Sequence, residues 1–240
     1  MLTVRLTPFD PIVLPGGDVL AAGGNGQNAD NCELYNPATG KWSITGSLNE
    51  GRWLFGAAQL TDGRVLVAGG YPNGHTPDFV PDSELYDPVS GTWSLSGALN
   101  RGRAGHVQQL LPDGRVLIAG GLAGDPFDAQ PTNTAEIFDP GTGEWALARP
   151  MNTPRVAFSG TLLNDGKVLV AGGGNATARL NSIEEYDPAT GRWHLLKTTL
   201  ASPRTDHTTT RLLDGSVLVV GGVDENNELP PDAERFVNPH

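Results

Sequence analysis

Arginines and glutamates recur at fixed positions in this 240-residue chain and are its most regular charged groups. Each arginine stands seventeen residues before the first residue of a glycine pair; they are Arg52, Arg103, Arg155 and Arg204. Each glutamate follows a glycine pair; they are Glu33, Glu84, Glu136, Glu184 and Glu234. Guanidinium groups bind carboxylates and phosphates through paired hydrogen bonds, but buried charges are normally paired inside a protein. The pattern therefore predicts ion pairs between neighbouring repeat units, unless an anion from outside occupies the arginines.

Two histidines share a second regular position, three residues after an arginine. They are His106 and His207, and phenylalanines take the same position elsewhere, at Phe9, Phe55 and Phe158. A position that alternates between His and Phe favours packing, whereas imidazole can also act as a base near neutral pH. No catalytic residue is predicted, and His106 and His207 are the candidates if the protein has one.

A further set of candidate ligand-binding residues breaks the repeat. Trp53 and Tyr71 have no aromatic counterparts in the other units, and Asn73 and His75 follow closely. These side chains would either form a platform for a sugar or peptide ring or cover one another against water. Asn175 and Asp224 are the candidates in later loops. The loop from Asp224 to Glu228 lacks the glycine and bidentate glutamate of a calcium loop, so no metal site is predicted.

The residues that must position these groups form a unit that occurs five times. Its best copy runs from Asp113 to Gly121, where an Asp-Gly turn precedes an apolar run and a glycine pair. In this unit, extended segments are expected at residues 104–110, 116–118, 135–138 and from 145, with both residues of the Asp-Gly turn at positive φ. Four antiparallel strands that repeat in this way predict an all-β propeller with five blades.

Length variation is confined to one class of loop. The segment between the glycine pair and the glutamate is nine residues from Gly24 to Glu33 but fifteen from Gly121 to Glu136. The intervals before the glycine pair stay nearly constant. Variable loops on a rigid frame are where binding residues are usually found.

The two ends of the chain lack complete units. The last unit, which begins at Arg204, stops before a tryptophan strand. We expect Leu2–Leu6 to supply its missing outer strand, because closure removes an exposed sheet edge. Pairing between chains is the alternative to this closure. The five similar units together make residues 1–240 a single domain.

Composition excludes several classes of partner. The formal net charge is -11, whereas nucleic acids and anionic membranes attract basic surfaces. No apolar run is long enough to span a membrane. A cytoplasmic monomer is expected, or a secreted protein if the N-terminus has been trimmed.

The repeat resembles the kelch motif. The resemblance rests on a glycine pair followed by Glu84-Leu-Tyr-Asp-Pro88, then Gly91 and Trp93, and it covers almost the whole chain. The style of the segment from Leu111 to Gly121 is similar to that of bacterial kelch-repeat proteins. The resemblance implies a kelch-type propeller. It also implies that the arginines and the loops after the glycine pairs line the face with which kelch substrate adaptors grip acidic peptides.

Three functions follow from these observations. The first is a binding module, without cofactor, whose loops and arginine-lined channel mouth hold a small acidic ligand or a peptide of a protein partner. The second is an isomerase or lyase that uses His106 or His207 as a base and Arg103 or Arg204 as an anion clamp. The third is a structural scaffold.

Overall fold

The computed structural model describes residues 11–25, 29–72, 78–124, 128–230 and 232–237. These residues form antiparallel strands and no helix, so the predicted all-β class is confirmed. In the same residues no helix long and apolar enough to cross a membrane is found. The chain divides into two compact units. Unit 1 comprises residues 1–104, 123–128 and 138–146, and unit 2 comprises residues 105–122, 129–137 and 147–240.

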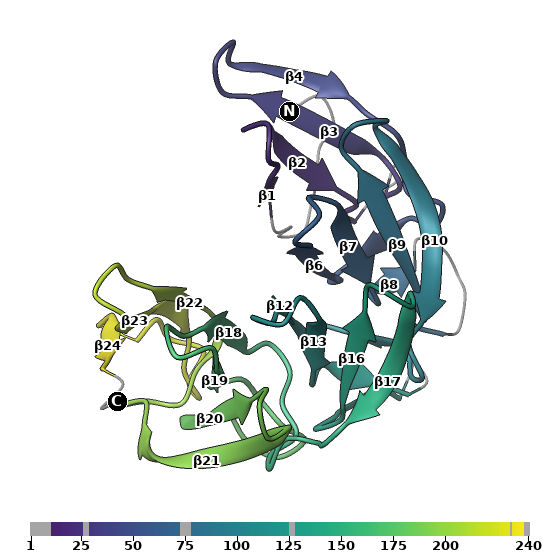
Figure 1. Cartoon of the computed structure of the whole chain (residues 1–240). Coiled ribbons are helices and arrows are strands. Elements are labelled where there is room, and N and C mark those ends of the chain that lie inside the picture. Colours follow the sequence, from purple (N-terminus) through teal and green to yellow (C-terminus); the bar gives the residue numbers. More distant parts are fainter. Residues whose placement is uncertain (1–10, 26–28, 73–77, 125–127, 231, 238–240) are drawn as a thin grey trace. The chain divides into compact units, whose positions relative to one another are not determined.

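Unit 1 contains two complete four-stranded sheets, which Figure 1 shows in purple and blue. The first has the order β1-β2-β3-β4, with strands Ile12–Val13, Val19–Ala22, Cys32–Asn36 and Lys41–Ile44. The second has the order β10-β9-β7-β6, and its strands from β6 onward are Gly56–Gln59, Val65–Ala68, Asp82–Asp87 and Thr92–Ala98. A short ribbon pairs β5, Arg52–Trp53, with β8, Tyr71–Pro72.

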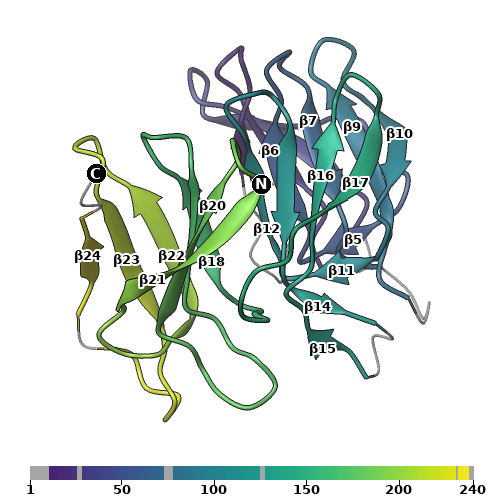
Figure 2. The same ribbon diagram turned by 60° about the horizontal axis from the view of Figure 1, so that its bottom comes forward.

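Unit 2 contains the sheet β18-β19-β20-β21, whose strands are Ser159–Leu162, Val168–Ala171, Ser182–Asp187 and Arg192–Thr199. It also contains the three-stranded sheet β22-β23-β24, labelled in Figure 2, with strands Thr205–Arg211, Val217–Val223 and Glu234–Phe236. The last sheet lacks a fourth strand among the described residues. The predicted closing strand, Leu2–Leu6, lies outside the described residues, so closure and the count of five blades stay predictions.

The third repeat forms the strands expected of it. The sheet β12-β13-β16-β17 comprises Val107–Leu110, Val116–Ala119, Ala135–Asp139 and Glu144–Ala148. The last three strands agree with the segments expected at 116–118, 135–138 and from 145. The first, expected at 104–110, begins only at Val107, because Ala104 belongs to β11 (Arg103–Ala104) in another sheet. The remaining short strands are β11, β14 and β15, at Arg103–Ala104, Leu122–Ala123 and Gln130–Pro131.

The Asp-Gly turns differ from the expected geometry. Gly114 has a φ of 88°, but Asp113 is absent from the described residues that have positive φ. The amide of Gly114 instead donates to the carbonyl of Leu111, and Asp113 Oδ1 accepts from the amide of Arg115 at 3.1 Å. The prediction of two positive-φ residues is therefore wrong. A turn whose single left-handed residue is a glycine satisfies the hairpin instead.

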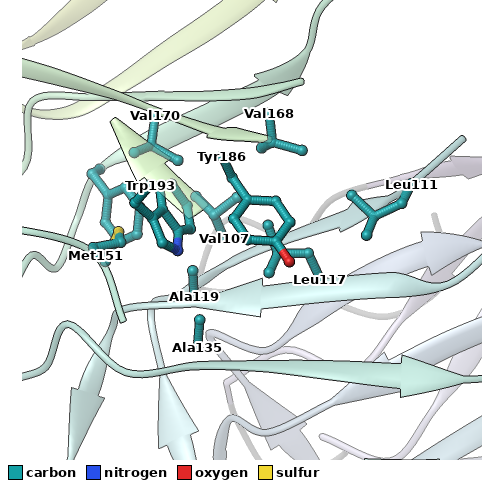
Figure 3. Close-up of a cluster of buried hydrophobic side chains, with 11 residues drawn as sticks. Val107, Leu111, Leu117, Ala119, Ala135, Met151, Val168, Val170, Tyr186 and Trp193 are labelled. Atoms are coloured by element: carbon teal, nitrogen blue, oxygen red, sulfur yellow. The ribbon is translucent and has the colours of Figure 1, made fainter. Parts of the chain in front are cut away.

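Aromatic pairs and apolar side chains fill the spaces between sheets. The paired rings lie 5.0–5.2 Å apart and are Tyr35–Trp42, Tyr86–Trp93, Phe138–Trp145 and Tyr186–Trp193. In unit 2, Trp193 and Tyr186 pack with Val107 and Met151 in one buried cluster (Figure 3). Indole N–H groups also bond to the preceding repeat, as from Trp93 to the Gly46 carbonyl at 3.0 Å. The tryptophans therefore join adjacent repeats, as their regular spacing predicts.

The glycine pairs join adjacent repeats as well. In the first four pairs, the second glycine donates its N–H to the carbonyl of the next arginine at 2.7–2.9 Å: Gly24→Arg52, Gly70→Arg103, Gly121→Arg155 and Gly173→Arg204. The first glycine of each pair has positive φ, and Gly23, Gly120 and Gly172 leave room for a ring of the following repeat. A Cβ on Gly23 would lie 2.5 Å from the Phe55 ring, and one on Gly120 would lie 2.7 Å from the Phe158 ring. Any larger residue would separate the repeats.

Candidate functional site

In unit 1, the guanidinium of Arg52 is buried and fully engaged. Its Nη2 lies 2.7 Å from Glu84 Oε1, and both side chains are 0% exposed. Its Nη1 donates to the carbonyls of Gly69 at 3.1 Å and Asp82 at 2.7 Å. Glu84 also accepts from the amides of Asn49 and Glu50. The pair therefore joins the glycine pair, the strand β9 and the segment that leads into β5.

Unit 2 repeats this arrangement. Arg155 Nη2 lies 2.7 Å from Glu184 Oε1, again with both side chains 0% exposed. Arg155 Nη1 donates to the Gly172 carbonyl at 2.8 Å, as Arg52 does to Gly69. Arg204 forms the corresponding ion pair with Glu234. Glu184 and Glu234 lie on β20 and β24, in the same sheets as the strands that follow their arginines. The expected pairing between repeats is therefore wrong for these three pairs, because each arginine pairs with a glutamate on the sheet of its own repeat.

Burial of the arginines limits what else they can contact. Arg52, Arg103 and Arg155 are 0% exposed and Arg204 is 2% exposed. Burial lowers the pKa of Arg52 and Arg155 from its ordinary value, and the paired glutamates oppose that shift. To reach Arg52, Arg155 or Arg204, a ligand would have to displace a carboxylate of the chain itself. The arginines thus hold the bases of the variable loops, which the glycine pairs begin.

His207 occupies a packing position. The side chain is 5% exposed, and its Nε2 donates to the Ala171 carbonyl at 3.1 Å. A Cβ on Gly172 would lie 2.6 Å from the ring, so His207 contacts this glycine as Phe158 contacts Gly120. Burial, with a smaller contribution from Arg204, lowers the pKa of His207 to about 4. At neutral pH the ring is uncharged in the folded protein. His106, the second candidate base, is half-buried.

Trp53 and Tyr71 come together at the start of the loop that follows the second glycine pair. They face each other across the β5–β8 ribbon, with ring centroids 4.7 Å apart and planes 20° apart. Phe79 packs edge-on against Tyr71, also at 4.7 Å. Trp53 and Tyr71 are half-buried, whereas Phe79 is 3% exposed, and burial raises the pKa of Tyr71. Asn73 and His75 lie outside the described residues. The repeat does not predict the role of Phe79, because this residue sits within a variable loop where no recurring position marks it.

The two candidates in unit 2 organise their own loops. Asn175 Oδ1 accepts from the amides of Thr177 and Ala178, both at 2.9 Å. Asp224 Oδ1 accepts from the amides of Asn226 and Glu228, both at 2.9 Å, and the bond from Glu228 is the main cause of its lowered pKa. The guanidinium of Arg179 donates to Asn227 Oδ1 at 2.7 Å and links the two loops. Both candidate side chains therefore shape loops, and the described residues contain no group of three or more potential metal ligands.

Comparison with known proteins agrees with this architecture. The family described as KLHDC2/KLHL20/DRC7 Kelch-repeats domain matches residues 11–222, so the chain belongs to the kelch-repeat family and folds as a kelch β-propeller. Among curated relatives, Kelch-like protein 40 of Mus musculus is 28% identical over 76% of this chain and 30% of its own length. Kelch-like protein 23 of Homo sapiens is 28% identical over 75% of this chain and 31% of its own length. The chain spans about a third of the length of these relatives. Both are mammalian, so they lend no support to a bacterial style of repeat.

Proposed function

We propose that this chain is a protein-interaction module that binds a peptide segment of a partner with the loops that follow its glycine pairs. The observation that carries this proposal is the Trp53–Tyr71 stack, which is half-exposed and has no counterpart in the other repeats. Tryptophan and tyrosine are enriched among the residues that supply most of the energy at protein interfaces. Family membership supports the same conclusion, since kelch substrate adaptors grip peptides with this class of loop.

The rigidity of the loop base favours binding at this place. Arg52 lies directly before Trp53 and is held by Glu84 and by two backbone carbonyls. Residues fixed by such contacts lose little conformational entropy when a partner binds. Each of three arginines already pairs with a glutamate of the chain itself; they are Arg52, Arg155 and Arg204. Our proposal therefore places ligand contact on the loops and gives the arginines a supporting role, in place of an arginine-lined site for a small acidic ligand.

Selection of binding peptides, followed by nuclear magnetic resonance mapping, would test this proposal. Peptides enriched from a random library on the immobilised chain would be titrated into the isotopically labelled protein. We expect the indole resonance of Trp53, assigned with Trp53→Phe, to shift together with the amides of Tyr71 and Phe79. Shifts confined to the outer strands β4, β10 and β21 would contradict the proposal, as would the absence of any enriched peptide.

A further inference from the structure

An open cavity of about 310 Å³ lies on the outer part of unit 2 and is lined by Arg149, Pro150, Arg192 and Trp193. Arg149 follows the last strand of one repeat, and Arg192 begins β21 of the next. The indole N–H of Trp193 donates to the Arg149 carbonyl at 3.0 Å, which joins two of the residues that line the cavity. The cavity is separate in sequence from the loops after the glycine pairs, so its role is independent of the proposed function.

The cavity occurs where the chain departs from its own repeat. The position four residues after the outer-strand tryptophan is a glycine in the first two repeats, Gly46 and Gly97, and an arginine in the third, Arg149. In the first two, the glycine amide donates to a turn carbonyl of the next repeat at 3.0 Å, and a Cβ would lie 2.3 Å from that oxygen. Close packing of this kind requires glycine. Arg149 cannot make the same close approach, and the cavity lies at this position.

Two arginines line this cavity, and neither forms an ion pair with a carboxylate of the described residues. Both of them, Arg149 and Arg192, are exposed. Asp187 faces Arg192 in the strand register but forms no ion pair with it; its carboxylate instead accepts from the Ala189 amide at 2.9 Å and the Thr190 hydroxyl at 3.0 Å. An anion bound at the cavity gains a favourable Coulomb interaction with both cationic side chains.

We propose that this cavity is a binding site for an oxyanion, a carboxylate or phosphate group, held by the guanidiniums of Arg149 and Arg192. Arginine presents paired N–H donors that match the geometry of both groups. The Trp193 and Pro150 rings form the apolar wall, which suits a small organic carbon skeleton or the stem of an acidic side chain. The site also provides local positive charge on a chain whose formal net charge is -11.

The Trp193 indole provides the readout for a test, because its N–H bonds to the Arg149 carbonyl within the site. Its resonance, assigned with Trp193→Phe, would be followed while citrate or inorganic phosphate is added at constant ionic strength. We expect a saturable shift in the wild type and a rise in Kd of about tenfold in both Arg149→Gln and Arg192→Gln, the loss typical of a charged hydrogen bond. Arg211→Gln, an exposed arginine on β22, is the matched control and should change Kd less than about twofold, as surface charges at a distance do.

Two further arms identify the source of the oxyanion and check the fold. Tighter binding of an acidic tetrapeptide than of citrate assigns the site to a side chain of a protein partner, and the reverse order assigns it to a free small anion. Arg149→Gly restores the residue of the first two repeats and should abolish the shift while leaving the thermal midpoint unchanged or higher. The proposal is overturned if no saturable shift occurs at millimolar probe, or if Arg211→Gln weakens binding as much as the two cavity variants.

Discussion

Replacing Glu184 with glutamine would test the structural role assigned to the arginine–glutamate pairs. The two carboxylate oxygens of Glu184 accept four hydrogen bonds, from the Asn152 amide at 2.7 Å, the Asn152 side chain at 2.8 Å, the Thr153 amide at 3.0 Å and Arg155 Nη2 at 2.7 Å. Glutamine would replace one acceptor oxygen with an NH2 group that faces donors. It would also leave Arg155 charged and 0% exposed without its counter-ion.

The expected loss follows from this burial. Removing one partner of a buried ion pair costs about 3–5 kcal/mol of unfolding free energy. For a chain of this length that corresponds to a fall of roughly 6–20 °C in the thermal midpoint. Urea unfolding followed by tryptophan fluorescence and by far-ultraviolet circular dichroism would measure the loss.

A matched substitution on the surface provides the control. Asp113 forms an ion pair with Arg115 at 2.6 Å, but the two side chains are 45% and 40% exposed. Asp113→Asn should therefore cost only about 0–1 kcal/mol. Equal losses in Glu184→Gln and Asp113→Asn would refute the reasoning. Removing both charges, with Arg155→Met and Glu184→Leu together, should recover part of the loss, because no uncompensated charge then remains buried.

Two further predictions concern the contacts of the glycine pairs. Burial lowers the pKa of His207 in the folded protein to about 4, below its value near 6.5 in the unfolded chain, so the unfolded chain binds the proton more readily. The free energy of unfolding is therefore unaffected by this group above pH 6.5. It falls by roughly 3 kcal/mol as the pH decreases from 6.5 to about 4. His207→Phe, which introduces the residue found at Phe158, should remove this part of the pH dependence. Urea unfolding at pH 7.5 and pH 4.5 would measure the free energy of unfolding. The assignment would be contradicted if the variant and the wild type lost the same free energy between these two pH values. Gly172→Ala places a Cβ 2.6 Å from the His207 ring at a φ of 61°, and should cost about 2–4 kcal/mol from overpacking and backbone strain. Gly221→Ala has a similar φ of 72° but meets no atom within 4 Å, so it should cost only about 1–2 kcal/mol; equal thermal shifts in the two variants would show that packing contributes nothing.

The sequence is sufficient to predict most strands of the sheets, because each repeat marks them with the same turn residues, apolar run and glycine pair. The apolar run at Val116–Ala119 and the aromatic pair Phe138–Trp145 lie where their spacing predicts. Recurrence also predicted that arginines and glutamates pair. Recurrence does not predict whether a glutamate pairs with the arginine of its own repeat or with that of a neighbouring repeat, because both arrangements have the same periodic spacing along the chain.

The candidate site was less predictable. Trp53 and Tyr71 stand out in the sequence because they interrupt the repeat, and their rings stack in the structure. Phe79 lies in a loop of unique length, so nothing in the sequence placed it against Tyr71. Asn175 and Asp224 stand out in the sequence only by their loop positions, and their side-chain oxygens bond to nearby backbone amides. Such hydrogen bonds from a side chain to the nearby backbone depend on the conformation of the loop, which the positions of Asn and Asp in the sequence do not reveal.

The affinity of Trp53→Ala for a selected peptide tests the central claim most directly. Leu95→Ala is the control, since Leu95 is an apolar residue on β10 that is 62% exposed and lies outside the glycine-pair loops. Calorimetric titration should show Kd about thirtyfold higher for Trp53→Ala, the loss expected of an interface residue worth roughly 2 kcal/mol, and little change for Leu95→Ala. Equal affinity of wild type and Trp53→Ala, with both variants folded, would contradict the claim that the loops after the glycine pairs form the binding surface.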